Sequence, residues 1–260
     1  MTTVGTGYYY TGKNSTVKIY DNDSVYGWTL EHTISSNDNA NWQDGNYRNL
    51  QCNAAGTEVA FVRTKGWVSS ANGGAGAYVG YTKHMSGSGT SWSDSIAEYG
   101  HDPNDAGNFR FTYKFSRDLR TLVASNPSHT QGQTSYVGRI ETATFADSSW
   151  SETGAAMGLS QNSKLRVHDV SADGSKIFAV NGSHFGSQGN QAFRYEQNNN
   201  STALTRVHSY PVPAIDPPPT GTSITQHNAN FIACNDDGDR VAIYYHSGSG
   251  AYYKRLDIIE

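Results

Sequence analysis

The chain has 260 residues, a formal net charge of −4, 16% charged residues and 12% aromatic residues, with 27 glycines and 17 tyrosines. The mild negative charge excludes a broad surface that neutralises phosphates, so we expect no nucleic-acid partner. No apolar run reaches the roughly 18 residues that a membrane-spanning helix needs, so we expect no membrane insertion. The first residues lack the basic and apolar regions of a secretory signal peptide. Low charge with abundant Gly, Tyr, Ser and Thr argues against both a helical and a disordered protein.

The N-terminal part predicts three short strands, at residues 7–12, 15–21 and 26–32, each rich in aromatic or β-branched residues. Beyond them, one pattern recurs four times: a strand, a tight turn and a second strand, at 51–62, 114–125, 169–180 and 233–244. The copies align when one turn position is shared by Gly56, Leu119, Gly174 and Gly238. Asp-Gly at 173–174 and 237–238 predicts hairpin turns in which both residues adopt positive φ.

A second repeated pattern follows two of these hairpins. Tyr78 precedes Trp92, and Tyr136 precedes Trp150, with the same spacing and an offset of 58 residues between the two copies. Each repeat therefore predicts four strands, which we name A to D: A precedes the turn, B follows it, C carries the Tyr-Val-Gly segment, and D begins near the Trp. Because Trp28 opens the last N-terminal strand in the same way, we expect these tryptophans to pack between repeats.

The repeats predict an all-β fold of stacked four-stranded antiparallel sheets, which is a β-propeller. A lone four-stranded sheet exposes two apolar faces and must stack on its neighbours to bury them. We favour five blades in one domain, residues 1–260, with repeat units at roughly 1–45, 46–106, 107–162, 163–228 and 229–260. The alternative is four blades with an additional N-terminal hairpin.

The segment Val170–Val180, with its Ser-x-Asp-Gly turn followed by an apolar strand, resembles the FG-GAP repeats of integrin-α-like β-propellers. Residues 124–127, Ala-Ser-Asn-Pro, lie where that family carries Gly-Ala-Pro. The repeats are similar to the divergent FG-GAP units of virion proteins from phages and large DNA viruses. The calcium loops of cell-surface members have partial matches at 21–23 and 235–239, and neither completes a set of ligands, so we expect no metal and no cofactor.

The two cysteines, Cys52 and Cys234, share one column of the alignment with Phe115 and Val170. A column that alternates between Cys and large apolar residues predicts buried free thiols. We find none of the usual nucleotide-binding or nucleophile motifs and no zinc spacing, so we expect no enzyme and no catalytic residues.

The candidate binding residues lie in the loops between strands B and C, which a propeller places on one face. They combine aromatic area with hydrogen-bonding groups and comprise Tyr10, Trp67, His129, His184 and His246. A purely structural role for the recurring histidines is the alternative. Other places for a site are the proline-rich connector at 211–219 and the opposite face of the ring.

These features together predict a non-enzymatic structural or binding module. We expect a component of a virus or phage particle surface, either a decoration protein or a receptor-contacting protein. Its partners would be other virion proteins, a host receptor or a glycan, and it could form a homo-oligomer. A carbohydrate-binding lectin propeller and a hydrolase with a site over the central channel are the alternatives.

Overall fold

The computed structural model describes residues 3–6, 16–23, 25–35, 46–68, 77–88, 91–93, 99–100, 112–127, 138–146, 149–157, 163–183, 191–197, 203–214, 228–246 and 254–260. Their regular structure consists of antiparallel strands, so the prediction of an all-β fold is confirmed. Within these residues no helix is long and apolar enough to cross a membrane. The number of blades in a closed ring stays a prediction.

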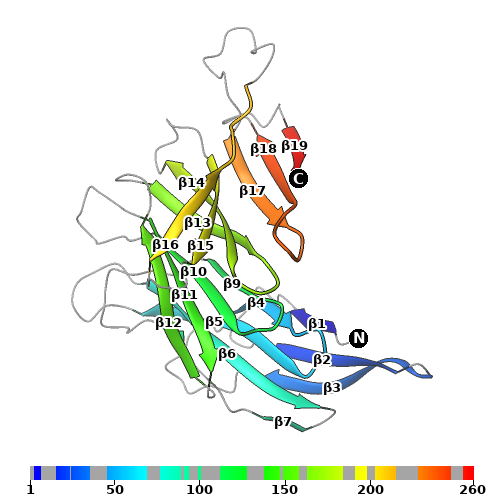
Figure 1. The fold of residues 1–260 in the computed structure, drawn as a ribbon. Helices are drawn as coiled ribbons and strands as arrows, with labels where there is room; N and C mark the ends of the chain where they lie inside the picture. The colour runs from blue at the N-terminus through cyan, green and yellow to red at the C-terminus, as the bar shows by residue number, and fades with distance from the viewer. Residues whose placement is uncertain are drawn as a thin grey trace.

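The described strands form five antiparallel sheets that follow one another along the chain (Figure 1). Sheet 1 comprises β1 (Thr3–Thr6), β2 (Thr16–Asp23) and β3 (Gly27–Ser35). Sheet 2 comprises β4 (Asn46–Cys52), β5 (Glu58–Val68), β6 (Ala77–Ser88) and β7 (Ser91–Ser93), with β8 (Tyr99–Gly100) also on β6. Sheet 3 comprises β9 (Thr112–Phe115), β10 (Thr121–Pro127), β11 (Gly138–Ala146) and β12 (Ser149–Met157).

Sheet 4 comprises β13 (Ser163–Val170), β14 (Lys176–Ser183), β15 (Gln191–Gln197) and β16 (Leu204–Ser209). Sheet 5 comprises β17 (Asn228–Cys234), β18 (Val241–His246) and β19 (Lys254–Ile259). Within sheets 2 to 5, each strand pairs with the next along the chain in the predicted order A, B, C, D, and sheet 5 has A, B and C among the described residues. The strand predicted at 7–12 lies outside the described residues, and the first strand is β1.

The B strands stack the sheets on one another because their successive side chains point to opposite faces. In β5, Val59 and Phe61 pack toward Ile19 of sheet 1, whereas Ala60 packs toward Leu122 of sheet 3. The same alternation in β10 sends Val123 toward sheet 4. In β14, Ile177 and Ala179 share the cluster of Val123, and Phe178 and Val180 pack toward Ile232 and Ile243 of sheet 5. Both faces of the three middle sheets are therefore buried, which explains the continuous apolar runs in their B strands.

Trp92 on β7 is 8% exposed and completes the cluster between sheets 1 and 2, as predicted. Its ring stacks on His32 of β3, with centroids 6.4 Å apart. Trp28 is 49% exposed, so the packing role predicted for it is wrong among the described contacts. The side chain of Trp150 lies outside the described residues.

The A–B turns share one backbone geometry. Gly56, Gly174 and Gly238 have φ of 71°, 77° and 65°, and Leu119 in the same column has φ of 59°. The N–H of each of these residues donates to the carbonyl three residues earlier, as in Gly174 to Ser171 (2.9 Å). The predicted turn type is wrong in one respect: positive φ occurs at Gly174 and Gly238 and not at the preceding aspartates. The turn is a wider loop that closes through the Ser171 N–H donating to the Lys176 carbonyl (2.9 Å).

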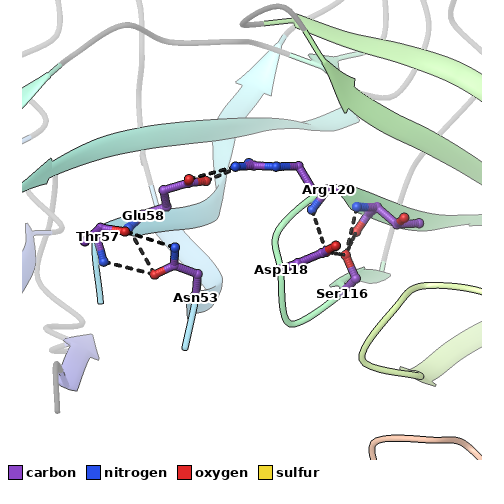
Figure 2. A network of polar contacts seen from close by, with 7 residues as sticks. Asn53, Thr57, Glu58, Ser116, Asp118 and Arg120 are labelled. Carbon is purple, nitrogen blue, oxygen red and sulfur yellow. Dashed lines mark hydrogen bonds and ion pairs between the residues drawn. The ribbon is translucent and has the colours of Figure 1, made fainter. Parts of the chain in front are cut away.

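A polar side chain three residues before the shared column closes each turn from inside. Asn53 Oδ1 accepts the N–H groups of Thr57 (2.9 Å) and Glu58 (3.2 Å), and Ser116 Oγ accepts the N–H of Thr121 (2.8 Å) (Figure 2). Ser171 and Asn235 do the same in sheets 4 and 5. In sheet 3, Asp118 also accepts the Ser116 hydroxyl (2.6 Å). Short Asn, Asp and Ser side chains suit these positions because they reach nearby backbone N–H groups.

Candidate functional site

The B–C loops that were predicted to form a binding face lie largely outside the described residues. Tyr10, His129 and His184 lie outside the described residues. Trp67 in β5 and His246 at the end of β18 have a described backbone, and nothing is described of their side chains. The grouping of these five residues therefore stays a prediction.

The described residues instead line an open cavity of about 520 Å³ at the opposite end of the B strands, beside the A–B turns. The last residues of β4, β9, β13 and β17 line it, together with the turns that follow them. Its polar and thiol-bearing lining residues are Gln51, Cys52, Asn53, Arg117, Asp169, Cys234, Asn235 and Asp236. Four repeat units thus contribute to one cavity.

Hydrogen bonds between successive turns hold the walls of the cavity in place. Gln51 Nε2 donates to the Ser116 carbonyl (2.9 Å), which links sheet 2 to sheet 3. The Arg117 N–H donates to the Ala172 carbonyl (3.0 Å), and the Ala172 N–H donates to the Asp236 carbonyl (2.8 Å). These two bonds link sheet 3 to sheet 4 and sheet 4 to sheet 5. The rim of the cavity is therefore a continuous chain of bonds across four sheets.

One ion pair spans the rim between non-adjacent sheets. The guanidinium of Arg117, on the turn of sheet 3, donates to Asp236 Oδ2 (2.6 Å) on the turn of sheet 5. Their side chains are 65% and 51% exposed, so water screens this pair. Such a solvated pair can exchange its partner for a ligand at a modest cost in stability, and it presents both a donor and an acceptor at the mouth of the cavity.

Both cysteines are free, as predicted, but the predicted burial is wrong in degree, because both are half-buried and border the cavity. Phe115 and Val170 in the same column are buried, at 3% and 8% exposure. Asp169 Oδ2 accepts the Cys234 N–H (2.8 Å). Burial, and after it the neighbouring Asp169 carboxylate, raises the pKa of the Cys234 thiol to about 12. Cys234 is therefore protonated at neutral pH, which makes it a poor nucleophile and a poor metal ligand.

His168 is a titratable group that the sequence did not single out. It lies on β13 next to Asp169, and its ring meets Phe231 of β17 edge-on at 5.3 Å. Burial, and after it the positive charges of Lys114 and Arg166, lower the pKa of His168 to about 4. The imidazole is therefore neutral at physiological pH and belongs to the packing between sheets 4 and 5.

The acidic loop at 235–239 uses its carboxylates for contacts between sheets. Asp236 pairs with Arg117, and Asp239 pairs with Lys176 of sheet 4. Within the part of the chain that the structure describes, no group of three or more His, Cys, Asp or Glu side chains could hold a metal ion. Asp236 and Asp239 therefore link the loop to sheets 3 and 4.

The sequence could have located this cavity only in part. The repeated turn that lines it is visible in the sequence, but the roles of Asn53 and Asn235, which close their turns through Oδ1, were not predicted. No periodic signal in the sequence shows that four turn ends meet around one space.

No protein-family model and no curated protein matches the chain. Solved structures share a general likeness. A hypothetical selenium-binding protein from Sulfolobus tokodaii aligns with 74% of the chain at 8% identity and a TM-score of 0.45. A prolyl endopeptidase structure aligns with 99% at 12% identity and a TM-score of 0.45. The chain spans 45% and 34% of the length of these two proteins.

The periplasmic gluconolactonase of Pseudomonas aeruginosa aligns with 100% of the chain at 14% identity and a TM-score of 0.38, over 81% of its own length. All these TM-scores lie below 0.5, so they assign the chain neither a family nor an activity.

Proposed function

We propose that the chain is a non-enzymatic structural and binding module whose sheets are the five blades of a β-propeller. The support is a contact that recurs at equivalent positions between neighbours. Glu58, two residues after the turn column of sheet 2, pairs with Arg120, one residue after that column in sheet 3. Lys176 and Asp239 occupy the same two positions in sheets 4 and 5 and also form an ion pair, with the charges exchanged. Equal contacts between successive units are what a rotation about one axis produces.

Small-angle scattering of the purified chain tests ring closure. A closed, compact molecule of this length has a radius of gyration of about 18 Å. A clearly larger radius, in a sample shown to be monomeric by light scattering, would contradict the closed propeller.

We propose further that the module belongs to the outer surface of a virus or phage particle. The low charge, the abundance of Tyr, Gly, Ser and Asn, and the resemblance to virion FG-GAP repeats support this role. Sheets that are stacked and bonded through their turns would give a rigid platform, and loops on such a platform are where recognition residues concentrate. Other virion proteins, a host receptor or a surface glycan are the corresponding partners.

Particles purified from the native source provide the test of this role. The chain should sediment with them in a fixed ratio to the major particle protein, and antibodies against the folded chain should label their exterior in electron micrographs. A chain found only in the soluble fraction, with unlabelled particles, would overturn the particle role and leave the fold untouched.

The cavity beside the A–B turns favours small-ligand binding as a second function. Its volume of about 520 Å³ lies within the range of small-molecule sites, and amide, carboxylate and guanidinium groups line it. Such groups recognise hydroxyl-rich ligands, so the lectin alternative gains support from this observation. The protonated thiol of Cys234 offers no activated nucleophile, so the cavity lends no support to the hydrolase alternative.

Binding to a glycan array, with Arg117→Gln as the test variant, examines this second function. We expect the variant to lose most of its binding, because it removes the donor at the rim of the cavity. Arg240→Gln is the matched control, since Arg240 is also 65% exposed and ion-paired, to Glu260 rather than at the cavity. Equal binding by both variants would place any glycan site elsewhere, and the loop residues Trp67 and His129 would be tested next.

A further inference from the structure

The outer edge of β19 differs from the equivalent edges of the neighbouring sheets. In sheets 3 and 4 the C strand pairs on that side with a fourth strand, β12 or β16. In sheet 5 no strand among the described residues pairs with β19 on its outer side. Figure 1 shows β19 at the margin of the fold, beyond β18. A sheet edge with unpaired N–H and C=O groups is a template for pairing with another strand.

The residues of β19 divide between two faces. Ile259 packs on the cluster between sheets 4 and 5, and Arg255 Nε donates to Asp257 Oδ1 (2.6 Å) on this same face. Lys254, Leu256 and Ile258 alternate with them and point the other way, and Glu260 follows directly after the strand, where it pairs with Arg240. Leu256 is 63% exposed, Ile258 is 72% exposed, and the side chain of Glu260 is 74% exposed. Two neighbouring aliphatic side chains thus stand in solvent between a positive and a negative residue.

This outward pattern, Lys-Leu-Ile-Glu, is complementary to itself when two strands run antiparallel. With Asp257 opposite Asp257, Leu256 lies opposite Ile258 of the second strand, and Lys254 lies opposite Glu260. Each position then meets either an aliphatic partner or the opposite charge, and such cross-strand pairs stabilise antiparallel sheets. The two central Asp257 carboxylates are each neutralised by Arg255 of their own strand.

We propose that β19 pairs antiparallel with β19 of a second copy of this chain, so that two three-stranded sheets become one continuous sheet across a two-fold dimer. The edge is self-complementary, as a two-fold interface requires. A dimer would cover Leu256 and Ile258 and satisfy the free edge. The residues of this surface do not line the cavity, and the proposal does not depend on the function proposed above.

Charge exchange tests the pairing. Sedimentation equilibrium of the wild-type full chain should show a monomer–dimer equilibrium. Lys254→Glu sets two negative charges against each other at both ends of the interface, and we expect dimerisation to weaken by about tenfold or more. Glu260→Lys should weaken it similarly, and the double variant Lys254→Glu/Glu260→Lys should return to near the wild-type affinity because the exchanged charges pair again.

The control variant is Lys18→Glu, which makes the same change at an exposed position on β2. It should leave the equilibrium unchanged. Thermal melting of every variant verifies that the monomer is folded, which matters for Glu260→Lys because Glu260 also pairs with Arg240 of its own chain (3.1 Å).

A cysteine crosslink tests the register. Paired residues of antiparallel strands bring their Cα atoms to about 4.5–5.5 Å, within disulfide range. Asp257→Cys should therefore form a disulfide-linked dimer on mild oxidation, located by peptide mapping because Cys52 and Cys234 are also present. Leu256→Cys should not, because its opposite residue is Ile258. A wild-type chain that stays monomeric, an affinity indifferent to Lys254→Glu, a double variant that is not rescued, or a crosslink through Leu256→Cys would each overturn the proposal.

Discussion

Leu119 adopts a backbone conformation that three glycines adopt at the equivalent turns, with φ of 59°. A left-handed conformation costs a non-glycine residue about 1–2 kcal/mol. The Leu119 side chain is fully buried among Phe115, Leu122 and Ala60, and burial of a leucine contributes about 1.5–3 kcal/mol. Burial of the Leu119 side chain therefore outweighs the backbone cost, which explains why the turn of sheet 3 can have a residue other than glycine at this position.

Gly174 cannot be replaced in the same way. A Cβ at Gly174 would lie 2.4 Å from the Cβ of Thr121 on the neighbouring sheet. We expect Gly174→Ala to destabilise the protein by about 2–4 kcal/mol, through strain at φ of 77° and displacement of Thr121. Gly27→Ala is the control, because Gly27 has φ of 73° with no atom within 4 Å of the added Cβ, and its cost should be about 1 kcal/mol. Urea denaturation measures both, and equal losses would refute a contact between sheets at Gly174.

His168 should make the protein sensitive to acid. Its pKa is about 4 in the folded chain and 6.5 in the reference state, so the unfolded chain binds a proton first as the pH falls. Stability is therefore lost progressively between pH 6.5 and about 4, by up to about 3 kcal/mol. In His168→Gln the difference in unfolding free energy between pH 7 and pH 4.5 should shrink, whereas the exposed control His208→Gln should behave as wild type. An unchanged difference in His168→Gln would show that other groups dominate the acid response.

At the scale of the elements, ion pairs between residues just after the A–B turns join sheet 2 to sheet 3 and sheet 4 to sheet 5. Arg120 donates to both carboxylate oxygens of Glu58, at 2.6 and 2.7 Å, and Figure 2 shows this fork reaching from the turn of sheet 3 to the start of β5. The Glu58 carboxylate raises the pKa of Arg120, and the guanidinium also lies 5.5 Å from the centre of the Phe145 ring. The bidentate geometry makes this ion pair a directional contact between sheets 2 and 3.

A double-mutant cycle with Glu58→Gln and Arg120→Gln should give a coupling energy of about 1–2 kcal/mol in urea denaturation. The side chain of Glu58 is 18% exposed, so solvent screens the pair less than it screens a surface pair. The control cycle is Arg240→Gln with Glu260→Gln, a pair 65% and 74% exposed, which should couple by less than about 0.5 kcal/mol. Equal couplings would indicate that the bidentate pair is as solvated as the surface pair and does not join the sheets.

At the scale of the whole molecule, the sequence predicted the class of fold and the order of strands within a sheet. Repetition made this possible, because a shared column of turn residues and alternating apolar strands are local signals. The sequence also predicted that Trp92 packs between sheets, and it was wrong about Trp28 because packing depends on what lies opposite each tryptophan. The number of blades, the resemblance to FG-GAP repeats and the particle role stay predictions.

The sequence by itself determined where the chain turns and in which order the strands follow one another within a sheet. Asn53, Ser116, Ser171 and Asn235 close their own turns with bonds over at most five residues, so their role could be inferred locally. Only the tertiary structure decided that four of these turns surround one cavity, that Arg117 reaches Asp236 across it, and that β19 has a free outer edge among the described strands. The physical reason is distance along the chain: those contacts join residues from different repeats, and their geometry depends on how each sheet is rotated against the next.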